Sequence, residues 1–196
     1  MTEISRTALF GKLNELAYQA LESATTFCKM RGNPYVELVH WLHQLFQLQD
    51  SDLHRIVRHF ELDQAKLAKE LTQSLDRLPR GASSLQDLSA QVEDTVERGW
   101  VYGSLLFNDA QVRSGYLLVG ALKTRELRRS VEAISAEFKK IPADTLCDTF
   151  ARIVGDSPES SLVSRDGAGG AASAPDGDEM PPAALGKQEA LAKYAQ

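Results

Sequence analysis

Two related stretches lie 76 positions apart in this sequence: Val36-Glu37-Leu38-Val39-His40-Trp41-Leu42-His43-Gln44-Leu45-Phe46 and Val112-Arg113-Ser114-Gly115-Tyr116-Leu117-Leu118-Val119-Gly120-Ala121-Leu122. Each opens with valine and has an aromatic or histidine residue four places on, leucine six places on and a large apolar residue ten places on. Self-similarity at a fixed period is typical of a duplicated structural unit. The sequence therefore predicts a repeat, against the alternative of two unrelated runs of amphipathic helix.

The segments around the two stretches extend the repeat. At the same offset, three apolar residues of the preceding segment fall on three of the second copy: Leu16 on Val92, Ala20 on Val96 and Ala24 on Trp100. Each copy is also followed by two segments whose apolar residues recur every three or four places, as on one face of a helix. We therefore expect an all-α domain over residues 1–155, built from two tandem pseudo-repeated four-helix units.

Helix boundaries are marked by capping residues. Asn33 followed by Pro34 predicts the start of the helix that carries Trp41, because Pro is favoured at the first helical position. Ser84 and Asp87 form a capping-box-like pair that predicts a helix from Leu85. Asn108 and Asp109 predict the start of the next helix. No run of alternating β-branched residues predicts a strand.

A change of composition follows Gly155. Residues 156–182 are rich in Ser, Gly, Ala, Asp and Pro, which bury too little apolar surface to offset the entropy lost on ordering. We expect a flexible linker there. Residues 183–196 regain helical character and include Leu191 and Tyr194, three places apart. We expect this end to be the truncated start of a further module.

Charge and composition exclude several classes of partner. Residues 1–155 carry 19 basic and 20 acidic side chains, so this region lacks the basic surface typical of a nucleic-acid-binding domain. Apolar runs are only a few residues long, which argues against a membrane partner. The N-terminus lacks the apolar core of a signal peptide. Cys28 and Cys147 lie at apolar positions of helices and fit reduced thiols, so we expect a cytoplasmic protein.

Motifs for catalysis or for a cofactor are not found in this sequence. Neither a phosphate-binding loop nor a Gly-x-Ser-x-Gly turn is present. His40 and His43 lie three places apart, but no further Cys, His or acidic residue completes the spacing of a zinc site. We interpret His40 as a packed residue and His43 as a solvent-facing one. We predict that these 196 residues bind no cofactor or metal and are not an enzyme.

Several segments resemble the N-terminal domain of the Clp/Hsp100 AAA+ unfoldases. They are Cys28-Lys29-Met30, Asn33 to Leu42, and Leu75-Asp76-Arg77-Leu78-Pro79, and the resemblance covers about residues 8–155. Further features resemble one branch, the ClpV ATPases of type VI secretion: an early first helix, Arg77 to Gly81, Trp100 to Leu106, and Ala190 to Ala195, which is similar to the start of the first ATPase module. Trp41, Gln44 and Gly115-Tyr116 depart from the general disaggregase pattern.

The resemblance implies a recognition module that passes substrates to a hexameric ATPase ring. In the ClpV branch the implied partner is a short helix near the N-terminus of a sheath subunit, which the ring extracts to disassemble the contracted sheath. ATP and Mg are then expected for the parent chain, as a homohexamer, while this fragment is expected to be a monomer. The alternatives are an N domain that binds adaptors or unfolded chains for a general Clp protease partner or disaggregase, and a self-contained helical protein.

A helix binds an apolar groove through residues at i, i+3, i+4 and i+7, which suggests a candidate site between two helices that correspond in the repeat. For Leu13 and Val92 a place in the core is the favoured alternative, whereas for Phe10 and Leu85 groove and core are equally supported. The predicted groove consists of Ile4, Leu9, Phe10 and Leu13 on the extended first helix and of Leu85, Leu88 and Val92 on the helix that opens the second unit.

Overall fold

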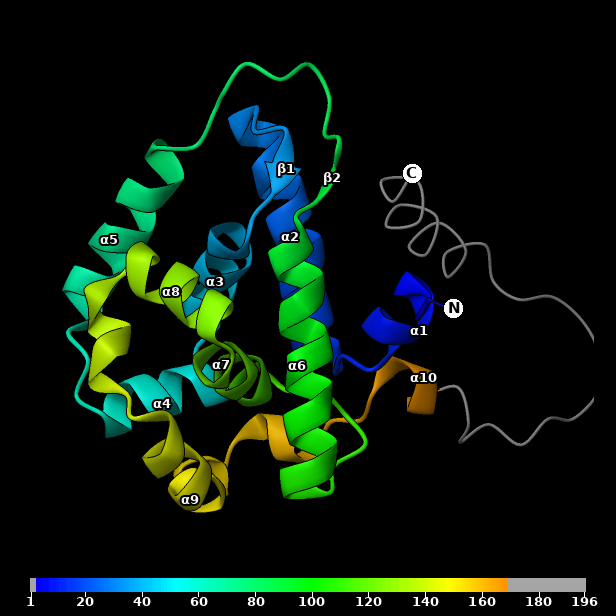
Figure 1. Ribbon diagram of the computed structural model, residues 1–196, viewed down its shortest axis with the longest axis vertical. Helices are drawn as coiled ribbons and strands as arrows, with labels where there is room; N and C mark the ends of the chain where they lie inside the picture. The colour runs from blue at the N-terminus through cyan, green and yellow to red at the C-terminus, as the bar shows by residue number, and fades with distance from the viewer. Residues whose placement is uncertain (1–2, 169–196) are drawn as a thin grey trace, which may run out of the picture.

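Two four-helix units form most of the computed structural model, which describes residues 3–168 (Figure 1). The first unit contains α2 (Glu15–Arg31), α3 (Leu38–Gln47), α4 (Asp52–His59) and α5 (Gln64–Asp76). The second contains α6 (Ala90–Phe107), α7 (Ser114–Lys123), α8 (Arg125–Ile134) and α9 (Ala143–Val154). The predicted all-α fold of two tandem units is confirmed.

Short elements complete the described chain. They are α1 (Arg6–Gly11), the 3-10 helices η1 (Ala136–Lys140) and η2 (Pro158–Ser161), α10 (Arg165–Ala168), and the two-residue strands β1 (Tyr35–Val36) and β2 (Asp87–Leu88). Helix α7 is buried along nearly its whole length and lies at the centre of the molecule (Figure 1). Within the described residues, no helix has the length and apolar character needed to cross a membrane.

Matching hydrogen bonds relate the two units. The parallel pair of β1 and β2 ends with the Ser89 amide donating to the Val36 carbonyl over 2.9 Å. The equivalent bond runs from the Asn14 amide to the Val112 carbonyl over 3.0 Å, next to a parallel bridge from Leu13. Asn14 and Ser89 are the N-caps of α2 and α6. Each unit therefore forms the same backbone hydrogen bond with the N-cap residue of the other unit's first helix.

The side chains that come after these pairs are also equivalent. His40 Nε2 lies 3.0 Å from Asn33 Oδ1, and the Tyr116 hydroxyl donates to Asp109 Oδ2 over 2.9 Å. Both pairs span the loop before the second helix of a unit, at an offset of 76 positions. His40 and Tyr116, which the sequence predicts to be equivalent, thus make equivalent hydrogen bonds in the two units.

The predicted register of the repeat is wrong by one residue in α2. The N-caps Asn14 and Ser89 are 75 positions apart, since α6 is one residue longer than α2. Val92 therefore corresponds to Ala17 and not to Leu16, and both Val92 and Ala17 are buried. A constant offset cannot detect an insertion inside a helix.

Three predicted helix starts are also wrong. Helix α3 begins at Leu38, because β1 and its pairing with β2 hold the chain extended after Pro34. The same pairing delays α6 to Ala90. Asn108 ends α6 in a left-handed conformation with φ of 51° and does not start α7. Two-residue strands carry no periodic pattern, so the sequence could not predict them.

The predicted linker is wrong for its first part. Residues 156–168 fold back over the two units as η2 and α10, and Glu159 is fully buried there. Buried polar contacts stabilise this segment, and composition alone does not reveal them. The rest of the predicted linker, residues 169–182, and the predicted module start, residues 183–196, lie outside the described residues.

Candidate functional site

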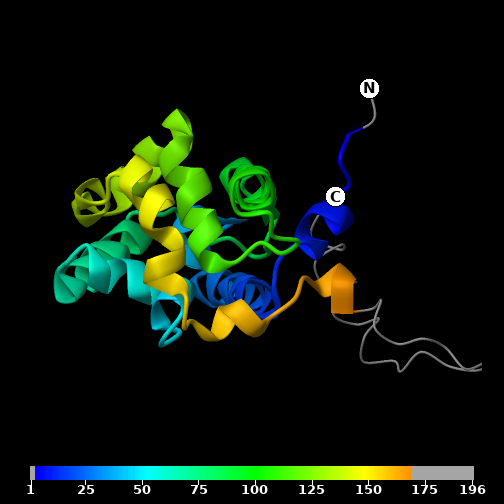
Figure 2. The same cartoon turned by 90° about the horizontal axis from the view of Figure 1, so that it is seen from below.

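The seven predicted groove residues lie in two segments. Four lie in or next to α1, and three lie in the stretch from Leu85 to Val92 that includes β2 and the start of α6. Helix α1 lies against α6 at one side of the molecule (Figures 1 and 2). The Arg6 guanidinium binds Asp87 over 2.8 Å and Glu93 over 2.5 Å. Near the other end of α1, the Lys12 ammonium lies 4.9 Å from the centroid of the Trp100 ring. These contacts hold α1 along α6 from Glu93 to Trp100 and against Asp87 of β2.

Most of the predicted groove residues are buried in this arrangement. Leu13 and Val92 belong to the core, which confirms the favoured interpretation of both. Phe10, Leu85 and Leu88 are also buried, so the expectation that they line an open groove is wrong for this structure. All three belong to the apolar core, and Phe10 is the single buried residue of α1.

Two of the seven residues remain accessible. Ile4 precedes α1 and is 67% exposed. Leu9 is partly buried and packs against the edge of the core. The structure therefore brings the predicted residues to one corner, formed by α1, β2 and the start of α6, but leaves only its outer edge open. We call this region the α1–α6 seam.

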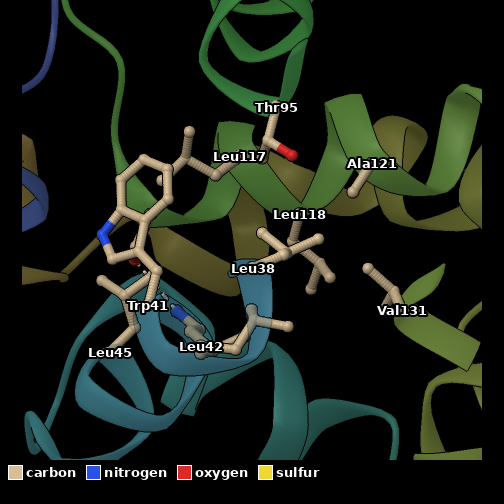
Figure 3. Close-up of a pocket in the computed structure, with 11 residues that line it drawn as sticks. Leu38, Trp41, Leu42, Leu45, Thr95, Leu117, Leu118, Ala121 and Val131 are labelled. Carbon is tan, nitrogen blue, oxygen red and sulfur yellow. Dashed lines mark hydrogen bonds between the residues drawn. The ribbon is translucent and has the colours of Figure 1, made fainter. Parts of the chain in front are cut away.

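The cavity between α3 and α7 is part of the core (Figure 3). It is lined by apolar side chains of both units, including Leu42, Leu118 and Val131, and holds only about 10 Å³. A space of that size accommodates at most one water molecule, and it offers few polar partners. Trp41 beside it donates its indole N–H to the Ala17 carbonyl over 3.1 Å. This cavity is a packing imperfection and not a ligand site.

A larger hollow of about 320 Å³ lies on the surface between α3, α5 and α8. Leu38, Leu78 and Ile134 supply its apolar lining. Arg77 and Glu37, which carry opposite charges, also line it. Sequence reasoning missed this hollow because its residues come from four separate segments, and the periodicity within each segment does not show how the segments pack together.

The titratable residues of α2 and α3 have structural roles. His40 Nδ1 accepts the Glu37 amide over 2.9 Å, so its Nε2 donates to Asn33, and burial lowers the pKa of His40 to about 4. His43 stacks on Phe27. Burial raises the pKa of the Cys28 thiol to about 12, which leaves it protonated and unreactive. His40 is thus the packed residue that the sequence predicts.

The described residues hold no cluster of three or more His, Cys, Asp or Glu side chains placed to bind a metal ion. They do hold a buried charged group that sequence reasoning missed. Arg113 binds Asp52 with two hydrogen bonds of 2.7 and 2.8 Å, and Glu159 lies beside them. A signal existed in Ser157-Pro158-Glu159, because Ser followed by Pro is a frequent helix start.

Comparison with known proteins identifies the class of this domain. The family model of the Clp repeat N-terminal domain matches residues 12–133. The AAA+ ATPase ClpV1 of Pseudomonas aeruginosa is 58% identical over 195 residues, which cover 99% of this chain and 22% of that protein. The chain therefore spans about a fifth of the length of this curated relative.

Solved structures agree with this match. One, from work on the coevolution of the ATPase ClpV, the TssB–TssC sheath and the accessory HsiE protein, is 63% identical, with a TM-score of 0.79 over 81% of this chain and 98% of that chain. Another, a ClpV N-domain in complex with a VipB peptide, is 26% identical, with a TM-score of 0.70 over 81% of this chain and 97% of that chain.

Proposed function

This chain belongs to the family of Clp repeat N-terminal domains, and on that premise we propose that it recognises substrates for a ClpV-type AAA+ ATPase. Its substrate is a sheath subunit of type VI secretion, which it binds through a short helix so that the ATPase ring can disassemble the contracted sheath. The single observation that carries the proposal is the 58% identity to ClpV1 across nearly the whole chain. The solved complex of a related ClpV N-domain with a VipB peptide supports it.

Nucleotide chemistry belongs to the remainder of a longer protein in this proposal. The chain spans about a fifth of its ClpV1 relative, and we place ATP and Mg²⁺ binding, together with assembly into a hexamer, in the part that it does not cover. The domain itself contributes recognition.

We propose the α1–α6 seam as the place where the sheath helix binds. Ile4 and Leu9 supply the accessible apolar contacts at its outer edge. Phe10 anchors α1 in the apolar core, and Leu85 and Leu88 are buried in the segment that leads into α6. The role proposed for Phe10 thus changes from direct contact to positioning of α1, and Leu85 and Leu88 become core residues.

A matched pair of variants tests this assignment. Ile4→Arg introduces a charge at the proposed contact, and Leu105→Arg does the same at an exposed leucine near the far end of α6; the two side chains are 67% and 78% exposed. We expect Ile4→Arg to weaken binding of a fluorescent N-terminal sheath peptide about thirtyfold, since a hot-spot contact contributes about 2 kcal/mol. Leu105→Arg should leave the affinity unchanged, and both should melt like the parent domain.

Equal affinities of Ile4→Arg and the parent domain would remove the seam assignment. An unfolded chain that competes with the sheath peptide at similar affinity would instead favour a general unfoldase domain. Fluorescence anisotropy with both competitors separates these outcomes.

A further inference from the structure

Residues 156–168 cross the molecule from the end of α9 to α1, and we call this segment the strap. Figure 2 shows it in orange, running from below α9 to α10 beside α1. The side chains that it buries, among those that the structure describes, are all polar: Ser157, Glu159 and Ser164. Val163 is exposed. Polar contacts therefore hold the strap, without a buried apolar anchor of its own.

Glu159 makes the central contact. Its Oε1 accepts the Asp52 amide over 2.8 Å and also the Ser114 hydroxyl. Its Oε2 accepts the Ser114 amide over 2.8 Å and the Asn14 side-chain amide over 2.9 Å. Asn14, Asp52 and Ser114 lie at the N-terminal ends of α2, α4 and α7. One carboxylate thus joins three helix starts from both units, where helix dipoles favour a negative charge.

The neighbours of Glu159 partly oppose this contact. Asp52 carries a second buried carboxylate, which the Arg113 guanidinium neutralises. Burial and then the charge of Asp52 raise the pKa of the Glu159 carboxyl. Arg113 also donates to the Ser160 hydroxyl over 3.1 Å. A few strong hydrogen bonds therefore hold the strap and offset the unfavourable desolvation of Glu159. Loss of this one side chain should strongly destabilise the bound strap.

The far end of the strap makes backbone contacts with the buried residues Leu13 and Asn14 and an ion pair at the surface. The Arg165 amide donates to the Leu13 carbonyl over 3.1 Å, and its guanidinium lies 3.8 Å from the centroid of the Tyr18 ring. Asp166 accepts from the Lys12 ammonium over 2.6 Å. The exposed ion pair contributes little to stability, so the backbone contacts with Leu13 and Asn14 hold this end of the strap, and Glu159 holds its middle.

We propose that the strap is a releasable element of the fold, held by Glu159, that sets where the rest of the chain leaves the domain. In the bound state the chain leaves beside α1, at Asp166 and Lys12. In the released state it leaves from the end of α9. Release frees the thirteen residues of the strap, which have a mean reach of roughly 20 Å at about 5–6 Å × √n.

Hydrogen–deuterium exchange on the 196-residue chain tests release, with Glu159→Gln as the variant. Three of the four groups that donate hydrogen bonds to Glu159 are N–H groups, and each carboxylate oxygen accepts from at least one of them. A glutamine NH₂ therefore faces a donor in either orientation. We expect exchange at the strap amides to rise roughly tenfold, with α3 and the middle of α7 unchanged. Glu132→Gln, which removes only the ion pair to Arg128, is the matched control.

A disulfide supplies the reverse test. A Cβ at Gly11 lies 3.6 Å from the Cβ of Asp166, a separation that suits a disulfide. With Gly11→Cys and Asp166→Cys added to Glu159→Gln, oxidation should restore slow exchange at the Arg165 amide, and reduction should remove it. Unchanged strap exchange in Glu159→Gln overturns the proposal. So does an equal rise in α3 and α7, because the strap would then open only when the whole domain unfolds.

Discussion

At the scale of single residues, His40 connects the loop before α3 to the first turn of that helix. It is fully buried, with a hydrogen bond at each ring nitrogen, and burial lowers its pKa from 6.5 to about 4. The neutral form is therefore the one that the fold accepts. Stability from this group is complete above pH 6.5 and is lost as the pH falls towards 4, because the unfolded chain then binds the proton that the folded chain refuses.

The low pKa of His40 gives a prediction with a defined sign. The melting temperature of the parent domain should fall between pH 6.5 and pH 4, whereas His40→Gln should be less stable at pH 7 and lose less over the same range. Thermal unfolding followed by circular dichroism measures both. A parent domain and a His40→Gln variant with identical pH profiles would contradict the assigned pKa.

Leu85 gives a second prediction at this scale. Its place at a predicted helix start suggests that Leu85→Arg would leave folding intact, but the side chain is buried. We expect Leu85→Arg to lower the free energy of unfolding by about 2–4 kcal/mol, as for loss of a core contact. Gln86→Arg, at an exposed neighbour, should change it by less than about 0.5 kcal/mol. Urea denaturation compares the two, and equal stabilities would show that Leu85 is no core residue.

At the scale of elements, the crossing of α6 and α7 depends on a missing side chain. A Cβ at Gly120 would lie 2.6 Å from the backbone nitrogen of Gly99, and backbone atoms cannot move aside as a flexible side chain can. Helix α7 could therefore approach α6 this closely only with glycine at this position.

We expect Gly120→Ala to destabilise the domain by about 2–3 kcal/mol, since overpacking forces the helices apart. Gly11→Ala, in α1, meets Asp166 at an ordinary 3.6 Å and should be neutral or slightly stabilising. Differential scanning calorimetry on the two variants measures the difference. A stable Gly120→Ala domain would mean that the two helices cross at a greater distance.

Elements with many buried apolar residues could be predicted from the sequence, and those stabilised by distant contacts could not. Leu67, Leu71 and Leu75 recur on one face and correctly predict α5. The starts of α3 and α6 could not be predicted, because the β1–β2 pair that delays them joins residues far apart in the chain. The candidate site shows the same limit: the pattern indicates that Phe10 and Leu85 are apolar positions on corresponding segments, but not that both are buried in the core.

At the scale of the whole molecule, the two units share a pattern of hydrogen bonds but differ in the segment that leaves each of them. The chain after α5 continues into β2, whereas the chain after α9 forms the strap and buries Glu159 against both units. The α1–α6 seam and the end of the strap meet at α1, where Lys12 binds Asp166. The proposed recognition site and the end of the strap are thus neighbours on one side of the molecule.

Titration of the ¹⁵N-labelled domain with an N-terminal sheath peptide tests the central claim most directly. The proposed function predicts that amide signals of residues 4–12, β2 and the first half of α6 shift together and saturate, while those of α5 and α8 stay in place. Shifts confined to the hollow between α3, α5 and α8, or no shift at millimolar peptide, would contradict recognition of a sheath helix at the α1–α6 seam.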